Sequence, residues 1–167
     1  YEATGELPKT AAPSLTDFED FFKKNTKDGA SVVFFTIIAE MSCTYNNARL
    51  AAEAFENVYV IDTRNLSTGG GLLVVTAGEM IKEGKPVSEI ASYCTALTEK
   101  ISASFIVDDL EFLHKGGRCS AVAMMGANVL KLKPCIEVSN EGGAMGVSKK
   151  YRGTLARVLE EYVKDRL

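Results

Sequence analysis

The sequence lacks long apolar runs and has no excess of positive charge. Its longest strongly apolar stretch, VVFFTIIA from Val32 to Ala39, is much shorter than the roughly 20 residues that a membrane-spanning helix needs. The formal net charge of -3 and the pI of about 5.3 give no general attraction to nucleic acid or to an anionic membrane. We therefore expect no nucleic-acid partner and no stable membrane insertion.

Paired metal-binding and redox motifs are also missing. The cysteines are far apart and form no C-x-x-C pair, so neither a zinc site nor a redox site is predicted. Each has small or apolar neighbours, which favours reduced core cysteines in a cytoplasmic protein. His114 is the single histidine, and a surface histidine without a chemical role is a simpler interpretation than a general base. The four cysteines are Cys43, Cys94, Cys119 and Cys135.

Helical and strand-like patterns alternate along most of the chain. Ser14 and Asp17 form a capping-box signature before apolar residues at helical spacing. After Pro134 the pattern changes to two short strands around an Asn-Glu-Gly-Gly turn. We expect helices at 14–25, 44–55, 66–85, 86–101, 120–130 and 152–167, and strands at 31–38, 57–62, 104–109 and twice within 135–150.

This alternation predicts an α/β fold in which helices cover both faces of a parallel sheet. The first three predicted strands are assigned to that sheet, and the last two begin a second α/β unit. In such folds ligands collect at the carboxyl ends of the strands, where helix N-termini present unpaired amides. Ser42 and Thr44 follow the first strand, either as helix caps or as hydroxyl donors to an anion.

The segment DDLEFLHKGGRCSA, from Asp108 to Ala121, follows the third predicted strand and is interpreted as a loop built to meet a ligand or partner. Gly116 and Gly117 give the backbone unusual freedom, and Arg118 offers a planar charged fork for a carboxylate or phosphate. Its apolar residues are expected to anchor the loop to the core or to line a cavity. These residues are Leu110, Phe112 and Leu113.

Other polar or glycine-rich segments have simpler explanations. STGGG lacks the spacing of a phosphate-binding loop, so close helix packing over the glycines at 69–71 is the better interpretation. SKKYRG is a basic patch that would ordinarily be solvated, although Arg152 could turn inward. There is no nucleophile elbow, no Ser-His-Asp order and no useful carboxylate pair, so a self-sufficient hydrolase is not indicated.

Five motifs in the correct order resemble those of the DegV family, bacterial fatty-acid-binding proteins that carry the lipid for fatty acid kinase. LPKTAAPS looks like T-S-x-P-S, MSCTYNNA like L-S-G-T-Y-x-x-A, and VYVIDT like V-x-V-I-D-S. VDDLEFLHKGGR is similar to D-x-L-x-x-L-x-K-G-G-R, and LKLKPCIEV with KKYRG is similar to L-x-I-K-P-I and K-x-R. The resemblance covers nearly the whole chain.

The resemblance implies a cytoplasmic lipid-binding protein that is not itself an enzyme and needs no cofactor or metal. A long-chain fatty acid would be buried, and its carboxylate would be presented to the catalytic kinase subunit for acyl-phosphate formation. Thr10, Ser42 and Thr44 would bind that carboxylate. The head-group or kinase-docking candidates would be Arg118, Arg152, Gly116 and Gly117.

The same resemblance sets the expected domain organisation. Residues 1–115 would form an α/β domain lacking its first strand and helix, and residues 116–167 would begin a second, helix-plus-strand domain. The chain is accordingly expected to be a piece of a longer protein. Two residues depart from the family motifs: Ala11 replaces a serine, and Cys43 replaces the glycine of S-G-T.

Two other functions are compatible with these residues. The first is a phosphoryl- or acyl-transfer enzyme that uses the helix-start site at Ser42 and Thr44, with Arg118 as a charge clamp. The second is a pure interaction protein, in which any pocket stays empty and Thr10 has no effect on a ligand.

Overall fold

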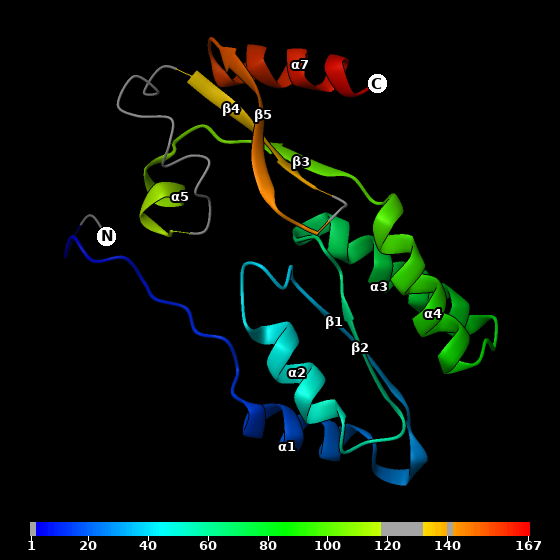
Figure 1. Ribbon diagram of the computed structural model, residues 1–167. Coiled ribbons are helices and arrows are strands. Elements are labelled where there is room, and N and C mark those ends of the chain that lie inside the picture. The colour runs from blue at the N-terminus through cyan, green and yellow to red at the C-terminus, as the bar shows by residue number, and fades with distance from the viewer. Residues whose placement is uncertain (1–2, 118–131, 140–141) are drawn as a thin grey trace.

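A computed structural model of the chain describes residues 3–117, 132–139 and 142–167 (Figure 1). These residues form two β-sheets with helices packed against them. The elements are α1 (Leu15–Asn25), β1 (Val32–Thr36), α2 (Thr44–Ala52), β2 (Val58–Asp62), α3 (Ser67–Lys82), α4 (Val87–Leu97), β3 (Ala103–Ile106), α5 (Glu111–Lys115), β4 (Leu132–Val138), β5 (Met145–Arg152) and α7 (Leu155–Arg166). Short 3-10 helices occupy Lys27–Gly29 and Thr98–Lys100.

The first sheet is the predicted parallel pair with helices on both faces. β1 and β2 pair in parallel, with Val32 opposite Val58 and Thr36 opposite Asp62. Because side chains alternate along a strand, one face of the pair packs against α1 and α2 and the other against α3 and α4. Continuous apolar strands of this kind are typical of parallel sheets covered on both sides. The predicted α/β architecture is confirmed.

The start of α1 also follows the sequence prediction. The Asp17 amide donates to Ser14 Oγ at 3.2 Å, and the Ser14 amide donates to the Asp17 carboxylate at 2.8 Å. These reciprocal bonds satisfy two amides that a helix start leaves unpaired. Phe18 and Phe22 then pack edge-to-face against Phe34 of β1, which fixes α1 on the sheet.

The second sheet corrects the assignment of the third predicted strand. β3 does not join the parallel pair; it pairs antiparallel with β4, which pairs antiparallel with β5. A short strand with both faces partly covered has the same residue pattern in either sheet, so its pattern alone does not choose its partner. The domain boundary between residues 115 and 116 stays a prediction, and the β3–β4 pairing crosses it.

Helices lie on opposite faces of this second sheet (Figure 1). Val158 of α7 packs on one face with Cys135 and Tyr151. On the other face Leu110 and Leu113 pack around Ile136, which explains why residues 111–115 form α5 inside the predicted loop.

The glycines at the start of α3 behave differently from one another. A Cβ at Gly69 would lie 2.1 Å from the Asn65 side-chain oxygen, which confirms close packing at that position. Gly71 has open space around it, so close packing does not explain that glycine. The helix predicted at 120–130 lies outside the described residues, and the two strands predicted around the Asn-Glu-Gly-Gly turn are confirmed as β4 and β5.

Candidate functional site

The carboxyl ends of β1 and β2 are joined by hydrogen bonds between buried polar residues. The Thr63 hydroxyl lies 2.7 Å from the Thr36 carbonyl oxygen, to which it can donate. The Ile38 amide donates to the Asn65 carbonyl at 3.1 Å. Thr36, Thr63 and Asn65 are all buried, so these bonds satisfy groups that would otherwise lose their water partners.

Asp62 links the two loops that follow these strands. Its carboxylate accepts hydrogen bonds from the Arg64 amide at 2.9 Å and from the Ala39 amide at 3.3 Å. Arg64 has a φ of 49°, a backbone conformation that few non-glycine residues adopt. The local hydrogen bond to Asp62 helps to hold it there.

Ser42 and Thr44 meet at the start of α2. Their hydroxyl oxygens are 2.7 Å apart, and the Thr44 amide donates to Ser42 Oγ at 3.2 Å. Ser42 therefore serves the helix start, which is one of the two roles predicted for it, although Cys43 stands at the N-cap position. One hydroxyl hydrogen lies between the two oxygens, so the second hydroxyl hydrogen of the pair can donate to another acceptor.

A cavity of about 460 Å³ borders the loop that precedes α2. Among the described residues, its walls come from the loop after β1, the two glycines that follow α5 and the β4–β5 hairpin. Met41, which immediately precedes Ser42, is one wall residue. The lining residues are Glu40, Met41, Gly116, Gly117, Gly143, Ala144 and Met145.

A neighbouring cavity of about 790 Å³ contains the predicted residue Thr10. Residues 5–10 of the N-terminal segment form one side, and Lys115 and Gly116 form the other. Gly116 borders both cavities. Thr10, Gly116 and Gly117 thus line neighbouring cavities. Ser42 and Thr44 are not among the lining residues of either, although Ser42 directly follows the wall residue Met41.

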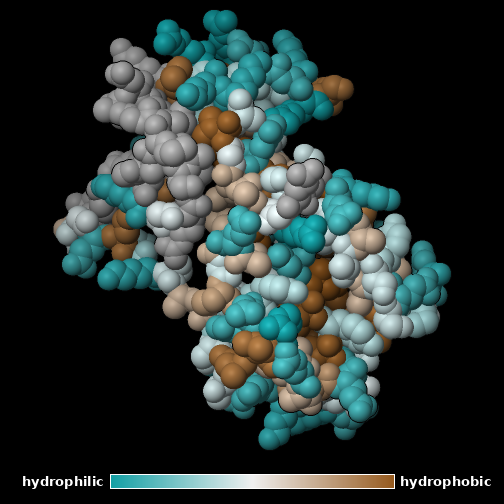
Figure 2. All heavy atoms as spheres, viewed as in Figure 1, coloured by the Kyte–Doolittle hydropathy of each residue, from teal (hydrophilic) through white to brown (hydrophobic). Residues whose placement is uncertain are grey.

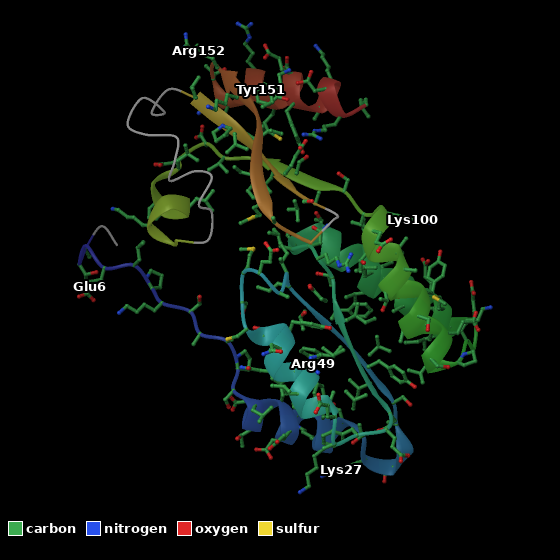
Figure 3. The ribbon with its side chains drawn as sticks, viewed as in Figure 1. Glu6, Lys27, Arg49, Lys100, Tyr151 and Arg152 are labelled. Atoms are coloured by element: carbon green, nitrogen blue, oxygen red, sulfur yellow. The ribbon has the colours of Figure 1, made fainter. Side chains whose placement is uncertain are left out.

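Arg152 is not part of this region. It is exposed at the last position of β5, whereas the wall residue Met145 is at the first, and a strand of that length separates them by about 24 Å. Figure 3 shows Arg152 beside α7, well away from Glu6 of the N-terminal segment. Arg118 lies outside the described residues.

Several of the wall residues were not predicted from the sequence. Glu40 and Met41 adjoin the Ser42 motif, so their place directly after a strand was an available signal. Gly143, Ala144 and Met145 were interpreted only as a turn and the start of a strand. Phe112 was expected to be buried or to line a cavity, but 52% of it is exposed and it lines none of the cavities described above.

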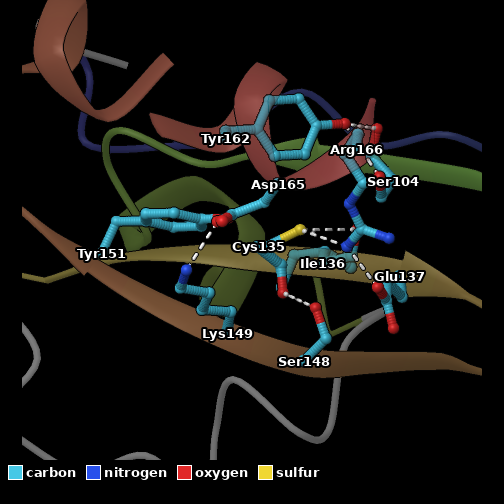
Figure 4. A network of polar contacts seen from close by, with 10 residues as sticks. All are labelled: Ser104, Cys135, Ile136, Glu137, Ser148, Lys149, Tyr151, Tyr162, Asp165 and Arg166. Atoms are coloured by element: carbon cyan, nitrogen blue, oxygen red, sulfur yellow. Dashed lines mark hydrogen bonds and ion pairs between the residues drawn. The ribbon is translucent and has the colours of Figure 1, made fainter. Parts of the chain in front are cut away.

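A second polar cluster attaches α7 to the antiparallel sheet (Figure 4). Tyr151 and Lys149 both donate to the Asp165 carboxylate, and Arg166 donates to Glu137 and, at 3.3 Å, to Cys135 Sγ. Burial, together with the adjacent Asp165 carboxylate, raises the pKa of Tyr151 to about 12. The hydrogen bonds from Lys149 and Tyr151 lower the pKa of Asp165. This cluster fixes a helix and lies apart from the cavity walls.

The cysteines only partly match their predicted role. Cys94 and Cys135 are free and buried, and burial raises the pKa of the Cys94 thiol. Cys43 is free but exposed, because it stands at the solvent-facing start of α2, so its prediction as a core residue was wrong. Cys119 lies outside the described residues.

Two further properties concern metals and membranes. Across residues 3–117, 132–139 and 142–167, no three or more His, Cys, Asp or Glu residues are grouped so that they could hold a metal ion. No helix in the described part of the chain is both long and apolar enough to cross a membrane.

A third cavity follows the edge of the parallel sheet. It has a volume of about 810 Å³ and lies along β2, between α2 and α4. Hydrophobic atoms are visible in the corresponding strip of the surface in Figure 2. None of the predicted site residues that the structure describes lines it.

The fold and the position of the cavity define a class: a helix-covered parallel sheet followed by an antiparallel sheet, with a cavity where the hairpin of the second meets the strand ends of the first. The family model for the DegV family matches residues 1–165. The chain therefore belongs to the DegV family.

Relatives and solved structures agree with this assignment. A DegV domain-containing protein of Clostridium acetobutylicum is 35% identical over 140 residues, which cover 82% of this chain and 50% of the relative. A fatty-acid-binding DegV family protein from Thermus thermophilus matches with a TM-score of 0.82 and 30% identity, over 98% of this chain and 58% of that one. A fatty-acid-binding DegV protein from Streptococcus agalactiae matches with a TM-score of 0.79 and 31% identity, over 98% and 59%. The chain thus spans between half and three fifths of these relatives.

Proposed function

We propose that this chain contributes to a protein that binds a long-chain fatty acid, with the carboxylate near Ser42, Thr44 and Thr10. The observation that carries the proposal is the cavity at the strand ends, whose wall residue Met41 immediately precedes the hydroxyl pair. Membership of a family with fatty-acid-binding members supports the choice of ligand.

The chemistry of the region suits an amphipathic ligand. Burial of an acyl tail contributes about 0.8 kcal/mol per methylene, whereas a buried carboxylate needs hydrogen bonds to offset its loss of water. Met41 and Met145 offer flexible apolar surface for the tail. Glu40 would repel the carboxylate, so the head group is expected on the side of the Ser42 and Thr44 hydroxyls.

The fatty acid would be presented to a kinase that phosphorylates its carboxylate, in the bacterial cytoplasm. In this proposal the chain itself is not an enzyme. Gly116 and Gly117, which border the cavity, would lie near the head group or the kinase. Arg118, outside the described residues, remains a candidate for the same role. Arg152, at the far end of β5, would serve as a docking residue only.

Lipid extraction tests the binding proposal. The protein is purified from bacteria and denatured, and the extract is analysed for fatty acids by mass spectrometry. We expect a stoichiometric fatty acid, which should be strongly reduced in the double variant Ser42→Ala and Thr44→Val. Thr76→Val is the matched control, because the Thr76 hydroxyl donates to the Leu72 carbonyl within α3 and Thr76 lines none of the cavities described above. Repeatedly empty wild-type protein would exclude the proposal.

Kinase docking is tested separately by reversing charge on β5. Lys150 and Arg152 are exposed neighbours there, and the double variant Lys150→Glu and Arg152→Glu should weaken binding to the kinase subunit in a pull-down or calorimetric titration. Its fatty-acid content should match that of the wild type. The double variant Lys23→Glu and Lys24→Glu, at two exposed positions of α1, makes the same change in net charge and serves as the control. Unchanged kinase affinity would remove β5 as the docking surface.

A further inference from the structure

Gly143 of the β4–β5 hairpin is buried against the loops that follow β1 and β2. It has a φ of 80°. A Cβ at this position would lie 2.6 Å from Ile38 Cγ2 and 3.2 Å from the Arg64 carbonyl oxygen. Real Cβ atoms do not tolerate such a contact, and neither neighbour can move easily: Ile38 is fully buried and the Arg64 atom belongs to the backbone.

The loops beneath Gly143 are themselves held in place. The Ile38 amide donates to the Asn65 carbonyl, and Asp62 receives the amides of both Ala39 and Arg64. Above Gly143, the hairpin is closed by the Gly143 amide, which donates to the Ser139 carbonyl at 2.7 Å. Gly143 is therefore the point of contact between the hairpin and the two loops, and hydrogen bonds hold the backbone on both sides of that contact.

Gly143 and the two residues that follow it form one wall of the cavity. Gly143, Ala144 and Met145 line it from one side, and Glu40 and Met41, which follow Ile38, line it from another. Any displacement of Gly143 from Ile38 would therefore move one wall relative to the other. The cavity width depends on how closely the hairpin approaches the loop.

We propose that Gly143 is a positioning residue for the ligand site: its lack of a side chain lets the hairpin rest on Ile38 and Arg64 and so sets the separation of the cavity walls. This inference rests on the proposed function for its ligand. It adds a residue, and a mechanism, to a site whose predicted residues lie on other segments.

The test compares two glycines of the same hairpin. Gly143→Ala introduces the clash, whereas Gly146→Ala adds a methyl where nothing lies within 4 Å and the φ is ordinary for any residue. Palmitate binding to delipidated protein is measured well below the melting temperatures of all variants. We expect roughly tenfold weaker binding for Gly143→Ala, the size of effect that one overpacked contact produces, and wild-type affinity for Gly146→Ala.

A purely structural role would lower the melting temperature of Gly143→Ala without changing the affinity of the folded protein. Wild-type affinity in folded Gly143→Ala would therefore overturn the inference. If that variant does not fold, Ile38 tests the same contact from the other side. Ile38→Val keeps the methyl that touches Gly143 and should bind normally, whereas Ile38→Ala removes it and should bind more weakly; equal affinities would again overturn the inference.

Hydrogen exchange gives a readout that needs no ligand. The Ser139 amide donates to the Ala144 carbonyl at 2.9 Å, and the Ile38 amide donates to Asn65. In lipid-free protein we expect both amides to exchange faster in Gly143→Ala than in Gly146→Ala, and equal rates would contradict the inference. Wild-type protein that binds no fatty acid would refute the proposed function, but the exchange comparison would still test the hairpin contact.

Discussion

Gly69 and Gly71 stand two positions apart in the first turns of α3 and have opposite surroundings. An added methyl at Gly69 meets the buried Asn65 side chain, which accepts from the Leu66 amide and donates to the Ile101 carbonyl. An added methyl at Gly71 meets nothing within 4 Å. Close packing therefore requires a glycine at position 69 but not at position 71, although both belong to the same glycine run in the sequence.

Alanine substitutions at the two positions should change the free energy of unfolding in opposite directions. Gly69→Ala is expected to lower the free energy of unfolding by about 2 kcal/mol or more, because Asn65 must give up its position. Gly71→Ala should raise it by about 0.5–1 kcal/mol through better helix propensity. Urea denaturation of both variants checks the prediction. Similar changes in both would show that Asn65 does not restrict Gly69.

Tyr151 should contribute to the free energy of unfolding, and this contribution should be lost at high pH. Its pKa is raised from the ordinary value of 10.0 to about 12, because burial and the Asp165 carboxylate favour the protonated phenol in the folded state. The contribution is therefore complete below pH 10 and is lost as the pH rises towards 12. The stability difference between wild type and Tyr151→Phe should shrink over that window, as measured by denaturation at several pH values. A constant difference would contradict it.

Some candidate site residues could be predicted from their local sequence, and others could not. Ser42 and Thr44 could be proposed because hydroxyl residues directly after a buried strand serve helix starts and anions alike. Gly143 could not, since its requirement comes from Ile38 and Arg64, which are more than 70 residues away in the chain. A glycine in a turn gives the same local signal whether or not another segment rests on it.

Helix α7 packs against the antiparallel sheet through one narrow face. Val158 is fully buried between α7 and the sheet, whereas the adjacent Leu159 is 42% exposed. Tyr162 adds a hydrogen bond from its hydroxyl to the Ser104 carbonyl at 2.9 Å. Adjacent residues of similar hydrophobicity thus have different energetic roles.

Truncation of these two neighbours tests the orientation of α7. Val158→Ala should lower the free energy of unfolding by about 2 kcal/mol, because it leaves a cavity among Cys135 and Tyr151. Leu159→Ala should change it by less than about 1 kcal/mol, since much of that side chain is already in water. Thermal melts of both variants provide the comparison. Equal losses would mean that α7 is rotated.

Most elements and the parallel pairing of β1 with β2 could be predicted from the sequence, but the partner of β3 could not. The capping box of α1 and the apolar runs of β1 and β2 are local signals, and they produced the elements expected. β3 was placed in the wrong sheet because its pattern is compatible with either sheet. α5 was missed because a five-residue helix is too short to show a clear period, and it depends on Leu110 and Leu113 packing around Ile136.

The cavity draws its walls from both sheets, so ligand binding should stabilise the protein as a unit. Palmitate binds only the folded state in this proposal and should raise the melting temperature of delipidated protein in proportion to the logarithm of its concentration. Hexadecanol has the same tail without the carboxylate and should raise it much less, because it cannot use charge-assisted bonds to Ser42 and Thr44. Equal shifts would indicate that the head group is not recognised.

The composition of the cavity wall has a consequence for synthesis of the chain. Glu40, Gly116 and Gly143 belong to segments that leave the ribosome at different times, and the loops between them must close before the cavity exists. A nascent chain that ends before Met145 has the helix start and the hydroxyl pair but lacks one wall. If the proposed function is correct, acquisition of lipid would therefore follow docking of the hairpin.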